Sequence, residues 1–458
     1  MLFRKLGGAL LAAAVSTTAS GEPEKPKVAP PGEQPVLRSI AQSVSASRIE
    51  ADVRDLVAFG TRHTLSDAEG PRGVTAATKW VKTELEAIAS SCGGCLDVKE
   101  LKAAIKPQDK VPRPMRVVNI VAMQAGKVDP ERYVIVTADI DSRASDVLDA
   151  TSDAPGANDN ASGLAALLEA ARLLSRHTLD STIVYAALSG TEQGLFGGRM
   201  LAQHARSNGW RVAAVITVDQ VGNVVGTSGI IENTAVRVFS EGVRIAETSE
   251  EKRQRDRIGG ELDSASRNLA RYVDRVASTY FTALDARLVL RSDRIGGMGN
   301  HQPFNESGFA AIRLTEATEN IHRLRENVRA ENGIAYGDVV ESVSFDYVAK
   351  VAGLTAITAA SIAWAPSVPT KVEIDPLASG TRVRWAKVDP KAAPDLAGYR
   401  VYWRATTSPT WERSAFVGDV DSVDIPSLVA DDLFFGVASV DHDGFESPVV
   451  FPGAAGAF

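Results

Sequence analysis

Several acidic residues share one kind of position in this sequence. Each lies just after an apolar segment with the pattern of a buried strand, or just before a helical pattern. They are Asp139 and Asp141 after 133–138, Asp159 within 155–163, Glu192 after 182–188, and Asp219 after 212–218. In an open α/β sheet, such positions converge on one crevice at the carboxyl ends of the strands. Gathered carboxylates repel one another, and a divalent cation usually compensates them, so the pattern predicts a metal site.

The elements that must position these carboxylates alternate between strand and helix. Tyr-Val-Ile-Val-Thr-Ala at 133–138 is apolar nearly throughout, as expected for a strand buried on both faces. The helix after it can begin at Ser162 and has leucines at helical spacing. Further strands are predicted at 182–188, 212–218 and 310–314, and helices at 195–205 and 345–363, the last amphipathic. This alternation predicts an α/β fold with a largely parallel mixed sheet and helices on both faces.

Two motifs carry a resemblance to a known family. Pro-Gly-Ala-Asn-Asp-Asn-Ala-Ser-Gly at 155–163, together with Glu-Gln-Gly-Leu-Phe-Gly at 192–197, resembles the two-metal zinc aminopeptidases. Their superfamily includes glutamate carboxypeptidase, glutaminyl cyclase and the transferrin receptor. The resemblance covers roughly 48–364 and implies a zinc exopeptidase-like domain with up to two zinc ions and a peptide or protein as substrate or ligand. It implies that Asp159 bridges both metals, that Glu192 ligates one of them and that Asp219 ligates the other.

Two positions depart from the family pattern. The family has His-x-Asp after its first strand, where this chain has Asp139 at the ligand position and Asp141 at the orienting position. The family's general base is a glutamate, and Thr191 stands in its place. A threonine hydroxyl cannot accept a proton near neutral pH, and general-base help is worth about 10²–10⁴-fold in rate.

The last metal ligand of the family is a histidine late in the domain. His322 is the candidate here, although a register anchored on Asn-Val-Arg at 327–329 would place Arg323 there instead. An arginine cannot bind a metal, but it could neutralise the carboxylates in the metal's place. His301, preceded by Asn300, matches an Asp-His segment of the family whose histidine lies near the site.

Two functions follow from this resemblance. The first is a metallopeptidase that hydrolyses N-terminal peptide bonds with metal-activated water. Its catalytic activity would be weakened or lost because of Thr191 and Asp139. The second is a non-catalytic pseudopeptidase that acts as a binding or scaffold protein. Losing the base and a ligand histidine together favours the second.

The N-terminal sequence predicts export. Arg4 and Lys5 precede a short apolar stretch and then small residues, the pattern of a signal peptide over 1–21. A linker is expected at 22–47, and the protein is expected to be secreted or periplasmic. In that compartment Cys92 and Cys95 are expected to form a disulfide. The net charge of −7 and the lack of a long basic run argue against nucleic acid as a partner, and no membrane span is expected.

The C-terminal part has a different pattern. Short alternating strands with aromatic residues run through 368–458. Arg-Val-Arg-Trp at 382–385 and Leu-Ala-Gly-Tyr-Arg-Val-Tyr-Trp-Arg at 396–404 resemble fibronectin type III domains. The pattern predicts an all-β immunoglobulin-like sandwich, and such domains are usually binding or spacer modules.

Overall fold

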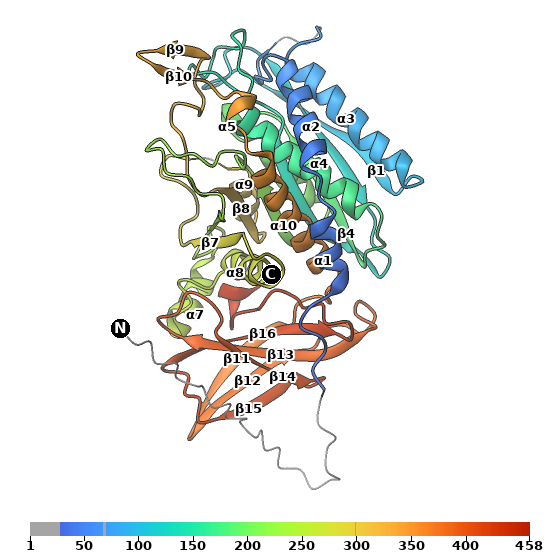
Figure 1. Cartoon of the computed structure of the whole chain (residues 1–458). Helices are drawn as coiled ribbons and strands as arrows, with labels where there is room; N and C mark the ends of the chain where they lie inside the picture. The colour runs from blue at the N-terminus through green and yellow to red at the C-terminus, as the bar shows by residue number, and fades with distance from the viewer. Residues whose placement is uncertain (1–27, 67–69, 298) are drawn as a thin grey trace, which may run out of the picture.

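The computed structural model describes residues 28–66, 70–297 and 299–458 (Figure 1). The predicted signal peptide at 1–21 lies outside the described residues. An α/β region forms the upper part of the molecule in Figure 1, and an all-β region packs beneath it.

The α/β region is built on one eight-stranded mixed sheet with the order β1-β2-β4-β3-β5-β8-β6-β7. Its strands are β1 (Leu96–Ile105), β2 (Met115–Gln124), β3 (Asp129–Asp139), β4 (Ser181–Leu188), β5 (Arg211–Val218), β6 (Ala235–Ser240), β7 (Asp285–Val289) and β8 (Ala311–Glu316). The four central strands, β4, β3, β5 and β8, run parallel to one another. These correspond to the four strands predicted from the sequence, so the expected α/β fold is confirmed.

Helices cover both faces of this sheet because its central strands are apolar on both sides. Val134 and Val136 of β3 pack into one core, while Ile135 packs into the other. The helices are α1 (Pro35–Gln42), α2 (Ala46–Ala58), α3 (Val74–Ser91), α4 (Gly163–Leu174), α5 (Thr191–Gly194), α6 (Phe196–Ser207), α7 (Ser249–Ile258), α8 (Ala265–Tyr280), α9 (His301–Glu306) and α10 (Phe345–Trp364). Residues of α1 to α4, α8 and α10 belong to the first core, and residues of α6 and α9 to the second.

Two elements differ from the sequence-based expectation. The segment predicted as a linker contains α1, whose Leu37 and Ile40 are buried in the main core. Pro35 begins this helix, where its missing N–H group costs nothing. The helix expected to be amphipathic, α10, is instead buried nearly all round. Its length and hydropathy would suit a membrane span, but 83% of that stretch is buried inside the molecule.

The all-β region consists of two three-stranded antiparallel sheets, β11-β12-β15 and β14-β13-β16. Their strands are β11 (Thr370–Leu377), β12 (Gly380–Ala386), β13 (Leu396–Ala405), β14 (Arg413–Gly418), β15 (Ser422–Pro426) and β16 (Leu433–Asp441). Trp385 of one sheet packs against Tyr399 of the other in a shared core. The predicted all-β architecture is therefore confirmed.

Buried ion pairs join the all-β region to the α/β region. Arg404 of β13 donates to both carboxylate oxygens of Asp263, at 2.9 and 2.8 Å. Arg271 of α8 donates to the same carboxylate at 2.6 Å. All three side chains are buried, so the two regions are held together by charges withdrawn from water.

The predicted disulfide between Cys92 and Cys95 is present and follows α3 directly. It lies in the short turn that leads from α3 into β1.

Candidate functional site

The carboxylates gather at the end of the sheet that points away from the all-β region, near α5 (Figure 1). Asp139 ends β3 and Asp219 directly follows β5, while Glu192 lies in α5, which follows β4. Asp159 lies in the kinked segment Ala157–Ser162 that precedes α4, where its own backbone angles are not helical. Parallel strands with short connections therefore bring together groups that are far apart in the sequence.

Arg325 bridges two of these carboxylates. Its Nε lies 2.9 Å from Oδ2 of Asp159, and its Nη2 lies 2.8 Å from Oε1 of Glu192. Nη1 of a second arginine, Arg143, lies 3.6 Å from the other oxygen of Glu192. Arg325 adopts a left-handed backbone conformation with φ of 55°, which few non-glycine residues adopt. A guanidinium thus lies between the two carboxylates that the family resemblance assigns to the metals.

The other two carboxylates predicted as metal ligands, Asp219 and Asp139, also have partners from the chain. Nη2 of Arg313 lies 3.0 Å from Oδ2 of Asp219, and Nη1 donates to Asp293 at 2.8 Å. Asn300 donates from Nδ2 to Asp139 in a very short hydrogen bond, and to Oγ1 of Thr191 at 2.8 Å. The side-chain amide of Asn300 therefore links Asp139, where the family has a ligand histidine, to Thr191, where the family has its general base.

Burial and charge set the protonation of this cluster. Burial, with Asp219, Asp141 and Asp159 nearby, raises the pKa of Asp139 well above its ordinary value. Burial also raises the pKa of Glu192, to about 7. Burial opposes ionisation of Asp159 too, but the charge of Arg325 and other arginines brings its pKa below the ordinary value. The partly exposed guanidinium of Arg325 thus helps to keep Asp159 ionised, while Asp139 favours its neutral form.

Two further carboxylates hold the backbone of the site. Asp141 accepts hydrogen bonds from the hydroxyl of Thr64 and from the backbone N–H of Glu192, both at 3.1 Å. Asp338 accepts from the backbone N–H groups of Asn158 and Asp159, at 2.8 and 2.7 Å. The first fits an orienting role for Asp141. Sequence reasoning missed Asp338, because it lies far from every recognised motif.

The histidines singled out in the sequence do not join the carboxylates. His322 packs its ring edge-on against Tyr336, with ring centroids 5.1 Å apart. The alternative, Arg323, points its Nη1 at the backbone oxygen of Gly337, 3.4 Å away. His301 is buried and hydrogen-bonds through Nε2 to the backbone oxygen of Ser292 at 2.7 Å. In this structure His322 does not reach the carboxylates, and Arg325 is the residue of this loop that does.

The residues present do not fit the two zinc ions that the resemblance implies. Zinc favours histidine nitrogen, thiolate and carboxylate donors in tetrahedral geometry. Within the described residues, no three or more histidine, cysteine, aspartate or glutamate side chains are arranged to hold a metal ion. Guanidinium nitrogens lie instead against Asp159, Glu192 and Asp219. The positive charge in this site comes from the chain itself.

Comparison with known proteins identifies the family. The model of Peptidase family M28 matches residues 119–344. A protein of Pyrenophora teres f. teres named Probable zinc metalloprotease is 39% identical over 428 residues, which cover 92% of this chain and 87% of the relative. A protein of the same name from Pyricularia oryzae is 38% identical and covers 91% of this chain and 84% of the relative. This chain belongs to peptidase family M28. Because 92% of the chain is covered, the relationship extends into the all-β region.

Solved structures agree with this M28 assignment at the level of the fold. The Legionella pneumophila protein LapA has a TM-score of 0.53 at 17% identity, covering 72% of this chain and 76% of that chain. LapB of the same organism has a TM-score of 0.51 at 18% identity, covering 70% of this chain and 73% of that chain. At such identities the likeness concerns the fold alone, so the chemistry of this M28 member has to be argued from its own residues.

Proposed function

We propose that this protein is a non-hydrolytic member of family M28 that acts outside the cytoplasm by binding a peptide or protein. The observation that carries the proposal is the bridge of Arg325 to Asp159 and Glu192, at 2.9 and 2.8 Å. A cation fixed to the chain neutralises these carboxylates, but it offers no open coordination position for water or a scissile carbonyl. In this proposal the guanidinium takes the place of the metal that would activate water in a metallopeptidase.

The position of the general base supports the same proposal. Thr191 is buried, and its hydroxyl accepts a hydrogen bond from Asn300. A neutral hydroxyl in this position cannot remove a proton from water at neutral pH. Glu192 lies next to it in the chain, but Arg325 already pairs with that carboxylate.

The relatives' printed name points to a second function, zinc-dependent proteolysis. For this chain it would require Arg325 to leave the cluster and another residue to replace the missing base. The four gathered carboxylates could then offer only oxygen donors, which hard cations prefer over zinc. The geometry of the described residues favours the non-hydrolytic function for these reasons.

Export of the chain is part of the same proposal. It rests on the charged and then apolar N-terminal sequence and on the disulfide between Cys92 and Cys95, since disulfides persist in oxidising compartments. N-terminal sequencing of secreted or periplasmic protein should find a start near residue 21. An intact Met1 on cytoplasmic protein would contradict export, but it would leave the proposal about catalysis unchanged.

The decisive experiment combines metal content with hydrolysis. The mature protein is purified without chelator, its zinc is measured by mass spectrometry, and a panel of aminoacyl reporter substrates is tested with and without added Zn²⁺ or Mn²⁺. We expect far less than one zinc per chain and no turnover above buffer, beside an active M28 enzyme as a positive control. Stoichiometric zinc together with turnover that a chelator abolishes would refute the proposal.

A further inference from the structure

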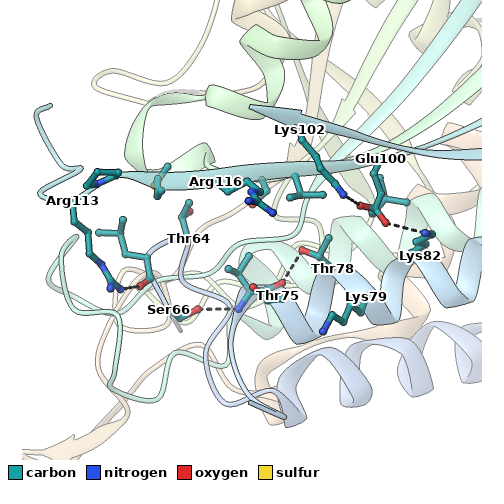
Figure 2. A pocket seen from close by; sticks show the side chains of 17 residues that line it. Thr64, Ser66, Thr75, Thr78, Lys79, Lys82, Glu100, Lys102, Arg113 and Arg116 are labelled. Atoms are coloured by element: carbon teal, nitrogen blue, oxygen red, sulfur yellow. Dashed lines mark hydrogen bonds and ion pairs between the residues drawn. The ribbon is translucent and has the colours of Figure 1, made fainter. Parts of the chain in front are cut away.

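A pocket lies between the first half of α3 and the β1–β2 hairpin (Figure 2). Its volume is about 570 Å³, within the range of small-molecule sites in proteins, about 300–1,000 Å³. Thr64 and Ser189 form part of its wall. The hydroxyl of Thr64 donates to Asp141, so this wall separates the pocket from the carboxylate cluster.

The periodicity of the strands determines what faces this pocket. Lys102 of β1 lies opposite Val118 of β2, and Glu100 lies opposite Ile120. Successive side chains of a strand point to opposite faces, so these pairs share the face toward α3. Asn119, between Val118 and Ile120, donates to the backbone oxygen of Gly197 on the other face. The floor of the pocket is therefore apolar and its outer edge is charged.

Positive charge dominates the lining. Its charged residues are Lys79, Lys82, Lys102, Arg113, Arg116 and Glu100. Glu100, the only acid among the lining residues that the structure describes, accepts from Lys82 at 2.8 Å and from Lys102 at 2.6 Å. Figure 2 shows this trio at one end of the pocket and Arg113 at the other, with Arg116 between them. A single carboxylate thus faces five cationic side chains.

Two of these cations are available to a ligand. Across the part of the chain that the structure describes, the side chains of Lys79 and Arg116 make no hydrogen bond or ion pair with another protein group. Arg113 donates to the backbone oxygen of Leu65 at 2.8 Å, which uses one of its five N–H groups. The hydroxyl of Thr75, in the first turn of α3, also lines the pocket. Cations and a hydroxyl therefore surround an apolar floor.

We propose that this pocket binds a small amphipathic anion, with a carboxylate or phosphate head and an apolar body. The head pairs with Arg116 and Lys79, because arginine binds both kinds of oxyanion in a bidentate manner. The body lies on the half-buried Val118 and Met115, whose further burial against a ligand supplies affinity at about 25 cal/mol per Å² of apolar surface. The pocket lacks aromatic side chains for base stacking, which disfavours nucleotides. This site is separate from the carboxylate cluster and does not depend on whether the protein hydrolyses peptides.

Calorimetry on the full mature protein tests the proposal with matched probes. Octanoate and octyl phosphate carry both features, octanamide lacks the charge, and inorganic phosphate lacks the apolar body. We expect measurable binding of at least one amphipathic anion, and at least tenfold weaker binding of octanamide and of inorganic phosphate. Whether octanoate or octyl phosphate binds more tightly identifies the head group. No binding of either anion, or equal binding of octanamide, would overturn the proposal.

Two variants test whether the anion binds in this pocket. The double variant Lys79→Gln with Arg116→Gln should weaken binding of the preferred anion at least tenfold. Lys99→Gln is the control, because Lys99 is an exposed cation of β1, the strand that pairs with β2, and it pairs with Asp97 and does not line the pocket. Circular dichroism confirms folding of each variant. An unchanged affinity in the folded double variant, or an equal loss in Lys99→Gln, would show that the anion binds elsewhere.

Discussion

Nε of Arg325 lies 2.9 Å from Oδ2 of Asp159, the carboxylate that the family resemblance assigns to bridging two metal ions. In a metallopeptidase the compensating charge enters as a separate ion and can leave again. Here the compensating charge belongs to Arg325, which lies in a loop that follows β8. One residue thus pairs with both Asp159 and Glu192, and our proposal attributes the loss of an open coordination position to it.

Replacing Arg325 by alanine should destabilise the protein. The change leaves Asp159 and Glu192 without their shared cation. Breaking a fully buried pair costs about 3–5 kcal/mol, and we expect on the order of 2 kcal/mol because water screens the partly exposed guanidinium. Urea unfolding measures this loss. Arg323→Ala is the control, since Arg323 contacts only the backbone oxygen of Gly337, and an equal loss there would contradict the special role of Arg325.

The same Arg325→Ala variant should acquire affinity for divalent cations. Without the guanidinium, the carboxylates repel one another, and an oxygen-rich cluster attracts hard ions such as Mn²⁺. Adding Mn²⁺ should raise the melting temperature of the variant in a concentration-dependent way, and that of the wild-type protein hardly at all. If Mn²⁺ stabilises both proteins equally, Arg325 does not exclude cations from this cluster.

Restoring peptidase activity should require at least three changes. Asp139→His with Thr191→Glu supplies a ligand and a base, but Arg325 would still bridge Asp159 and Glu192. We expect the double variant to remain inactive, and the triple variant with Arg325→His to hydrolyse aminoacyl reporter substrates when Zn²⁺ is added. Such groups act as a unit, so the effects should not be additive. Full activity of the double variant would show that Arg325 moves aside without cost.

The sequence predicted the central strands and the convergence of Asp139, Asp159, Glu192 and Asp219, because strand periodicity and motif spacing are local properties. It also predicted that an arginine of the late loop could neutralise carboxylates. The arginine it named was Arg323, whereas Arg325 reaches the cluster, since the conformation at Arg325, with φ of 55°, depends on the packing of the whole loop. The pairing of Arg313 with Asp219 was not predicted either, because the sequence of β8 predicts only a buried strand.

The ion pairs between the two regions should contribute strongly to stability. Asp263→Asn leaves Arg404 and Arg271 buried without a counter-charge, and breaking a buried ion pair costs about 3–5 kcal/mol. Calorimetry should show a lower melting temperature or two separate transitions. The control is Asp424→Asn, which breaks the exposed Arg382–Asp424 pair inside the all-β region, worth about 0–1 kcal/mol. Similar effects of both changes would mean that the junction contributes little.

The last prediction concerns pH and Asp441, at the end of β16. Burial, with Asp395 and Asp443 nearby, raises the pKa of this carboxyl to about 7 in the folded protein. In the unfolded chain its pKa is about 3.9. The folded state thus binds the proton more tightly, and the resulting stability is fully present below the unfolded pKa and is lost as pH rises through about 7. Asp441→Asn cannot ionise, and its side-chain oxygen can still accept the hydrogen bond from the N–H of Phe445.

The melting temperature of Asp441→Asn should therefore rise above that of the wild-type protein as pH increases from 4 to 8, by on the order of a few degrees. All other titrating groups are common to both proteins, so the difference isolates Asp441. Asp395→Asn, which removes one neighbouring charge, should shift the stability in the same direction by a smaller amount, because burial is the larger cause of the raised pKa. A difference that stays constant between pH 4 and 8 would show that Asp441 titrates alike in the folded and unfolded states.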